Sequence, residues 1–405
     1  MLKSIFLLLA SLLATAHAGD LTFTLEGAVA QALRHHPELT VARLRLEEAR
    51  GRLEQSGRLS NPELDLDFTR QTTGREGALE IGFLQRFPLT ARLRHEKAVT
   101  RAELAAAQAE TRDRERTLAA EVRAVAIKLL ALDAQRALRA RQLAASRELT
   151  AFLQKRAESG EASSIEVAQV ELEARKIEIE SLQFSAQEAV LIGELRPLLG
   201  LADPSKSIRI RGELSAPAKV APANDAASRP DVQAAQARAN AAHAAAAQQR
   251  ASRWEDIGVG ATYSRARTKD EPSSTETEQV VGLKVSIPLP FWNRNAGRIH
   301  EAEAAAARTV AEMEATQLRA RAEAGAARDE MTALARLLAE LDATLLPKAR
   351  EVEEQLRNSY AAGLLPLTDV LRARTQSLDL QGQRLTALRD YHLARARYTA
   401  ALGQP

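Results

Sequence analysis

An internal duplication limits what this chain can fold into more than any other feature of its sequence. A chain that repeats its breaks and apolar positions in the same order consists of two copies of one supersecondary unit. Both halves must therefore form the same elements in the same order. Matching residues recur at offsets of 193, 200 and 203: Pro37 and Pro230, Phe87-Pro88-Leu89 and Ile287-Pro288-Leu289, and Gly160 and Gly363.

Each half contains two stretches in which apolar and polar residues alternate, the pattern of a strand with one apolar and one polar face. Prolines such as Pro288 end them, because proline cannot donate to a strand ladder. The rise in offset from 193 to 200 predicts an insertion in the loop of the second strand pair, around Arg265 to Glu278. The four stretches cover about 61–70, 78–88, 254–265 and 279–289.

A long helical hairpin follows the strands of each half. From Thr90 to Ser159 there is no proline or glycine, a length of about 100 Å if all of it is helical. The hairpins are expected over about 90–200 and 293–403. The later rise in offset predicts a second insertion in the long helix of the second half or at its tip, where Pro347 should kink the path. Apolar residues in the first long helix step by four and three, as in a coiled coil: Leu118, Val122, Val125, Leu129 and Leu132.

The chain begins with the pattern of a secretory signal peptide. Lys3 precedes an apolar run, and Ala16-His17-Ala18 is a small-x-small cleavage site. The sequence contains no cysteine, which excludes disulfides, a thiolate metal site and a lipidated N-terminal cysteine. The expected organisation is a signal peptide over 1–18, a first repeat over 19–200, a linker over 201–229 and a second repeat over 230–405.

No later segment is apolar over the roughly 18–20 residues that a membrane helix needs, so a β-barrel would have to hold the chain in a membrane. The four strands of one chain cannot close a barrel, and an open edge in lipid is prohibitive. Three copies would supply twelve strands and a lumen. We therefore expect a mainly α chain with a membrane β-barrel: a trimeric 12-stranded outer-membrane barrel continued by a periplasmic α-helical barrel.

Catalysis is not expected, and neither a cofactor nor a metal site is predicted. The histidines lack ligand spacing, the three methionines form no ladder for copper, and no Gly-rich phosphate loop is present. Asp65 and Asp67 lie on the polar face of a strand, where a lumen wall is the expected role. The net charge of +3 is spread along the helices. Nucleic acid is therefore not expected as a partner.

The chain resembles the TolC-like outer-membrane efflux proteins over nearly its whole length after the signal peptide. The resemblance rests on the opening Thr24-Leu25 with Pro37, on the duplicated order of elements, and on Ala362-Gly363 followed by Thr368-Asp369-Val370-Leu371. Within the family, the segment from Ile287 to Gly297 resembles the cobalt–zinc–cadmium resistance branch. Copper/silver-branch and many drug-efflux members carry a lipidated N-terminal cysteine, which this chain lacks.

The resemblance implies a homotrimeric channel in contact with outer-membrane lipid. The trimer would dock on a periplasmic adaptor and an inner-membrane pump of the resistance–nodulation–division type, and would passively conduct divalent heavy-metal cations such as Co²⁺, Zn²⁺ or Cd²⁺. A channel of a multidrug or type I export system is an alternative. A periplasmic coiled-coil adaptor or scaffold is the alternative outside the channels, and it would not explain the aromatic residues beside the strand ends.

Three groups of residues are candidates for function. Gly160 and Gly363 are expected at the periplasmic tip turns, where an adaptor would dock. Glu166 and Asp369 are expected either as acids favoured at a helix N-terminus or as a carboxylate ring that gates the aperture, with Arg372 one turn after Asp369. Four aromatic residues are expected at the membrane–water interface, followed by Asn293 as a helix cap: Phe87, Trp254, Phe291 and Trp292.

Overall fold

The structure is a computed structural model that describes residues 21–72, 76–160, 162–217, 229–270 and 274–404. The predicted signal peptide, residues 73–75 between the first two strands and residues 218–228 of the linker lie outside the described residues. The first half contains β1 (Leu21–Phe23), α1 (Leu25–His35), α2 (Pro37–Gln55), β2 (Glu63–Arg70), β3 (Gly77–Phe87), α3 (Arg92–Glu158), α4 (Ser164–Leu198) and β4 (Ile208–Ile210). The second contains α5 (Pro230–Ala251), β5 (Ile257–Asp270), β6 (Ser274–Ser286), α6 (Ala296–Glu340), the π-helix η2 (Leu341–Leu345), α7 (Leu346–Ala361) and α8 (Leu367–Ala401).

The two compact units of the chain do not coincide with its two repeats. One unit comprises Met1–Leu39, Glu115–Ala223 and Glu323–Pro405, and the other comprises Thr40–Arg114 and Asn224–Ala322. Each unit takes segments from both halves, because elements of one repeat pack against elements of the other. The boundaries read from the sequence therefore mark copies of a pattern and not separate folding bodies.

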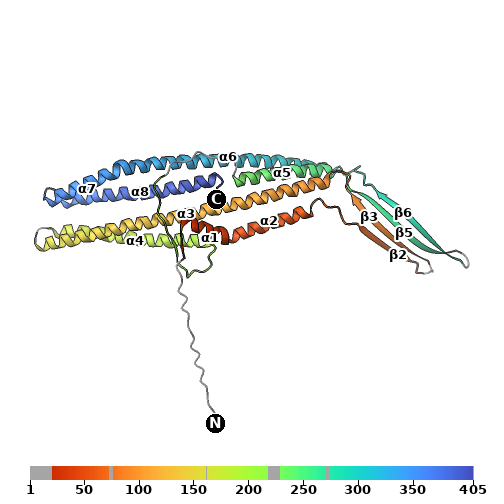
Figure 1. The fold of residues 1–405 in the computed structure, drawn as a ribbon, viewed down its shortest axis with the longest axis horizontal. Helices are drawn as coiled ribbons and strands as arrows, with labels where there is room; N and C mark the ends of the chain where they lie inside the picture. The colour runs from red at the N-terminus through yellow and green to blue at the C-terminus, as the bar shows by residue number, and fades with distance from the viewer. Residues whose placement is uncertain (1–20, 73–75, 161, 218–228, 271–273, 405) are drawn as a thin grey trace, which may run out of the picture. The chain divides into compact units, whose positions relative to one another are not determined.

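The second unit contains an antiparallel four-stranded sheet in the order β2-β3-β5-β6, whose strands lie side by side in Figure 1. The hairpins of the two halves meet at β3 and β5, which pair from Gly77 opposite Arg267 to Phe87 opposite Ile257. Within the chain, β2 and β6 each have one neighbour in this sheet. Each therefore has one edge of backbone N–H and C=O groups without a strand partner.

The second hairpin corrects the strand ranges of 254–265 and 279–289 that the sequence suggested. Its strands are 14 and 13 residues long, against 8 and 11 in the first hairpin. The ladder continues from Arg265 opposite Gln279 to Asp270 opposite Ser274. The inserted residues thus lengthen two strands instead of enlarging a loop, because threonine-rich polar segments sustain strand pairing where hydrophobic alternation has ended.

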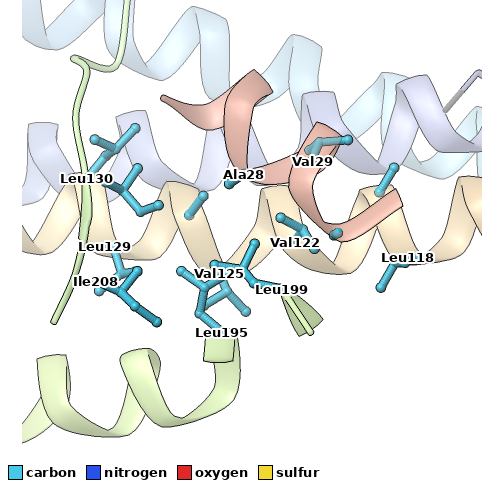
Figure 2. Packing of buried hydrophobic residues seen from close by; sticks show 14 of the residues in the cluster. Ala28, Val29, Leu118, Val122, Val125, Leu129, Leu130, Leu195, Leu199 and Ile208 are labelled. Atoms are coloured by element: carbon cyan, nitrogen blue, oxygen red, sulfur yellow. The ribbon is translucent and has the colours of Figure 1, made fainter. Parts of the chain in front are cut away.

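The largest buried cluster lies in the other unit and confirms the predicted seam of the first long helix. Leu118 and Val122 are fully buried, and Val125 and Leu129 nearly so. Figure 2 shows these side chains of α3 packed with Ala28 and Val29 of α1 and with Leu195 and Leu199 at the end of α4. Apolar residues three and four apart share one helix face, so this face of α3 is the core.

Local rules set most helix ends. Thr24 is the N-cap of α1: its hydroxyl accepts from the Gly27 N–H at 3.0 Å. Within the predicted linker, Ile208–Ile210 forms a short strand that pairs in parallel with Leu21–Phe23, a partner that the sequence did not indicate.

Two details of the second long helix differ from expectation. The helices α6, η2 and α7 contain 45, 5 and 16 residues, so together they are nearly as long as α3 with its 67 residues. The predicted second insertion therefore lies before Ala296 and not in the long helix or its tip. Asn293 does not cap this helix: its side chain accepts from the Asn295 N–H at 3.1 Å, and Asn295 has a φ of 59°, a conformation that asparagine tolerates. The π-helix precedes Pro347 and accommodates a ring that a regular helix would exclude.

Candidate functional site

The two faces of the sheet have opposite chemistry. The register places Leu64, Phe83, Ala261 and Leu283 in one row on the same face. The next row of that face contains Leu66, Ile81, Tyr263 and Val281. Leu283 is 88% exposed and Leu66 is 67% exposed, so this apolar face is uncovered within one chain.

The opposite face is acidic. Among the described side chains, its strand positions hold six carboxylates and two cations, Arg86 and Lys284. Arg86 forms an ion pair with Glu63 at 3.3 Å. The described side chains of the apolar face include no carboxylate. The six carboxylates are Glu63, Asp65, Asp67, Glu80, Glu276 and Glu278.

One pair on the acidic face opposes stability. Asp67 lies directly opposite Glu80 in the ladder, and like charges in that position destabilise a sheet. Both residues are exposed, so water screens part of the repulsion. Such an arrangement fits a surface selected for its charge and not for its packing.

Glycines on the same face allow the strands to approach closely. A Cβ at Gly260 would lie 2.5 Å from the carbonyl oxygen of Phe83, and one at Gly282 would lie 2.8 Å from the Thr262 hydroxyl. Neither distance is compatible with a side chain unless its neighbours move. In the sequence, the readable signal for this close approach is the pair Gly258 and Gly260, two residues apart within β5.

Gly160 and Gly363 lie where the helical hairpins turn. Both have left-handed backbone conformations, with φ of 76° and 74°. Gly363 donates to the carbonyl of Tyr360 at 2.9 Å, and Leu364 donates to that of Ser359 at 3.0 Å, which is the pattern of a glycine C-cap. A residue with a Cβ would be strained at either position.

Glu166 acts as a helix cap. The Ser163 N–H donates to the Glu166 carboxylate at 3.1 Å, and the Ile165 N–H donates to the Ser163 hydroxyl at 3.2 Å. These bonds complete a capping box at the start of α4. Burial and, secondarily, the Glu166 carboxylate raise the pKa of Tyr360.

The two tips pack together inside one unit through a small apolar cluster. Leu153, Val170 and Leu367 are each no more than 1% exposed. Asp369 lies in the first turn of α8, which has no side-chain cap, and it accepts from the Arg372 guanidinium at 3.4 Å. Asp369 and Arg372, one turn apart, thus form an ion pair, and the two repeats use their tip carboxylates differently.

The four aromatic residues lie beside the strand ends that connect to helices. Trp292 is 97% exposed, and its ring meets that of Phe291 edge-on with centroids 6.2 Å apart. Phe87 ends β3, and Trp254 precedes β5 by three residues. Both are also exposed. Among the described residues, no three His, Asp or Glu side chains are arranged to hold a metal ion.

The family model for outer membrane efflux proteins matches residues 28–201 and 222–404. This match covers most of the chain, which therefore belongs to the outer membrane efflux protein family. The family consists of efflux channels of the outer membrane. No curated protein matches the sequence, and no helix in the described part of the chain is both long and apolar enough to cross a membrane.

Solved structures share the fold at low identity. CusC is 19% identical with a TM-score of 0.78 over 94% of this chain and 92% of that chain. VceC from Vibrio cholerae is 22% identical with a TM-score of 0.75 over 94% and 96%. The MtrE channel of Neisseria gonorrhoeae is 17% identical with a TM-score of 0.75 over 94% and 89%. The family match and the shared fold thus confirm the predicted fold class and the outer-membrane location.

Proposed function

We propose that this chain is the outer-membrane channel of a tripartite efflux system and that it passively conducts divalent heavy-metal cations such as Co²⁺, Zn²⁺ or Cd²⁺. The observation that carries the proposal is the acidic face of the sheet, with six carboxylates against two cations among its described side chains. The apolar face suits lipid, so the acidic face suits the lumen. Carboxylates that line a pore favour cations.

The assembly proposed is a homotrimer. In lipid, the free edges of β2 and β6 must find partners, and neighbouring copies of the same chain provide them. Because the natural chain has no cysteine, single cysteines can be introduced without background. Leu66→Cys combined in turn with cysteines along β6 should give a limit species of three cross-linked chains. A stable monomer in detergent would contradict the proposal.

The periplasmic tips are proposed to meet an adaptor, which in turn contacts a pump of the resistance–nodulation–division type. Gly160 and Gly363 would present the docking turns, while Glu166, Asp369 and Arg372 would surround the aperture. The exposed Arg372 side chain supports an aperture in which Asp369 is held by an ion pair until the tip opens.

Metal ions are proposed as the substrate on the resemblance of the Ile287–Gly297 segment to the metal-resistance branch, together with the acidic face. A multidrug or type I export channel is the alternative. Deletion of the gene should sensitise cells to Co²⁺, Zn²⁺ or Cd²⁺ more than to large amphiphilic drugs. Lost drug tolerance with intact metal tolerance would favour the alternative.

The direct test is ion selectivity in planar bilayers. The triple variant Asp65→Asn, Asp67→Asn, Glu80→Gln should lower the cation-to-anion permeability ratio, measured from the reversal potential in a salt gradient. The matched control removes three charges from the opposite face of the same sheet: Arg70→Gln, Arg265→Gln and Arg267→Gln. An unchanged ratio in the first variant, or an equal change in both, would contradict the assignment of the acidic face to the lumen.

The aperture has its own test. Combining Glu166→Ala with Asp369→Ala should raise single-channel conductance or alter cation preference. If neither changes, the two carboxylates stabilise the tips without gating them.

A further inference from the structure

Three arginines gather on the apolar face of the sheet, next to the hairpin turns. The ladder places Arg70, Gly77 and Arg267 in one row across β2, β3 and β5, and Arg265 lies two residues from Arg267 on the same face. Adjacent strands are about 4.8 Å apart and residues i and i+2 about 7 Å apart. Three guanidinium groups therefore lie within reach of one small ligand.

The three arginines of this cluster have side chains that are open to a ligand. All three are exposed, and none of their side chains forms a hydrogen bond or ion pair with another described residue. By contrast, Arg86 on the opposite face is paired with Glu63. Gly77 has no side chain, so the surface between Arg70 and Arg267 stays open. Glu76, at the turn beside Gly77, is the carboxylate nearest in sequence, and its carbonyl accepts from the Gln71 N–H.

The position of the cluster suggests what it contacts. Along the strands toward the hairpin turns, the arginine cluster follows directly on the apolar rows. Arg265 shares a row with Phe68 and Leu79. The helices leave the strands at their opposite ends. In the proposed channel the helices lie in the periplasm, so the arginines lie at the outer boundary of the lipid. Unpaired arginines at that level face lipid headgroups, and guanidinium groups bind phosphate with matching geometry.

We propose that Arg70, Arg265 and Arg267 form a binding site on the outer surface of the barrel for a phosphate-bearing lipid headgroup of the outer leaflet. The open surface over Gly77 accommodates the headgroup, and the apolar rows below it accommodate the acyl chains. The site holds lipid around the channel and is separate from the path of the exported cation.

The experiment uses the full-length protein in detergent and two probes, lipid A with both phosphates and the same lipid with the phosphates removed. Native mass spectrometry measures the binding of each. An arginine near an anionic lipid surface contributes about fivefold to binding, so the wild-type protein should prefer the phosphorylated probe by about 100-fold. The preference should weaken as salt is raised.

Three variants define the result. Arg70→Gln with Arg265→Gln and Arg267→Gln should lose the preference, whereas lysine at all three positions should keep part of it. A control with Arg298→Gln, Arg319→Gln and Arg321→Gln removes three exposed charges from α6 and should bind like wild type.

The proposal is overturned if the wild-type protein binds both probes equally, or if the glutamine variant keeps the preference. It is also overturned if millimolar inorganic phosphate abolishes the preference, because the site would then belong to the free anion. If the glutamine variant does not assemble, the comparison of the two lipids on the wild-type protein still tests the proposed site. If the protein is cation-selective in bilayers but shows no preference for the phosphorylated lipid, the lipid site is excluded and the proposed transport function still holds.

Discussion

The same two strand positions contain carboxylates in the first half of the chain and glycines in the second. At the repeat offset of 193, Asp65 and Asp67 of β2 correspond to Gly258 and Gly260 of β5. Both pairs point to the acidic face, but β2 is an edge strand and β5 lies between β3 and β6. At Gly260 the carbonyl oxygen of Phe83 occupies the space a Cβ would need, whereas Asp65 and Asp67 are exposed within the chain.

The two helical tips also have different side-chain interactions at equivalent positions of the repeat. The first is closed by a capping box in which Glu166 bonds the backbone, and the second by an ion pair between Asp369 and Arg372. A duplicated backbone thus preserves the positions of elements and leaves individual side chains free to take different roles. Exchanging equivalent residues between the halves measures how much each position tolerates the residue of the other half.

The largest effect is expected from Gly260→Asp, which gives the second half the residue of the first. Its Cβ would lie 2.5 Å from the Phe83 carbonyl oxygen, and such overpacking costs about 1–3 kcal/mol. Trimer yield and the denaturant midpoint should both fall. Gly260→Ala separates the steric effect from the charge and should show most of the loss.

The reciprocal exchange is the control. Asp67→Gly removes a side chain from an edge strand and should cost only about 0.5–1 kcal/mol through backbone entropy, partly offset by relief of the repulsion with Glu80. Equal stability losses for the two exchanges would mean that the close approach of β3 and β5 is not what distinguishes the halves.

A smaller difference is expected at the tips. Glu166→Ala removes half of a capping box and should cost about 1 kcal/mol, seen as faster hydrogen exchange in the first turn of α4. Asp369→Ala breaks an exposed ion pair, which is worth about 0–1 kcal/mol, and should change exchange in α8 less. Glu166→Gln can still accept from the Ser163 N–H and should behave like wild type. Equal changes at both tips would argue against the asymmetry.

The smallest effect concerns His392, whose counterpart at an offset of 203 is Ala189. Its Nε2–H donates to the Ser215 carbonyl at 2.8 Å, and burial lowers its pKa below the usual 6.5. Because the folded-state pKa lies below the unfolded-state value, the histidine contribution is present above about pH 6.5 and is lost as pH falls through the folded-state pKa. His392→Gln should flatten the stability profile of the second hairpin between about pH 7 and pH 5. An identical profile in wild type and variant would exclude this residue as the cause.

Periodicity revealed the long helices because it reflects a local requirement. Leu118, Val122, Val125 and Leu129 lie on one face of a helix whichever elements cover them. The Thr24 cap and the glycine turns at Gly160 and Gly363 likewise depend on neighbours within six residues. Element ends were less accurate where polar residues continued a ladder, as between Arg265 and Glu278.

The sequence by itself determined the duplication, the helical seams, the tip turns and the alternation of each strand, because these follow from side chains close together in the chain. Only the tertiary structure decided that β3 pairs with β5, since that register joins residues far apart in the sequence. The register in turn places carboxylates from both halves on one face and three arginines on the other. Strand pairing is set by packing and backbone hydrogen bonds across the whole sheet, so neither charge pattern could be read from one strand.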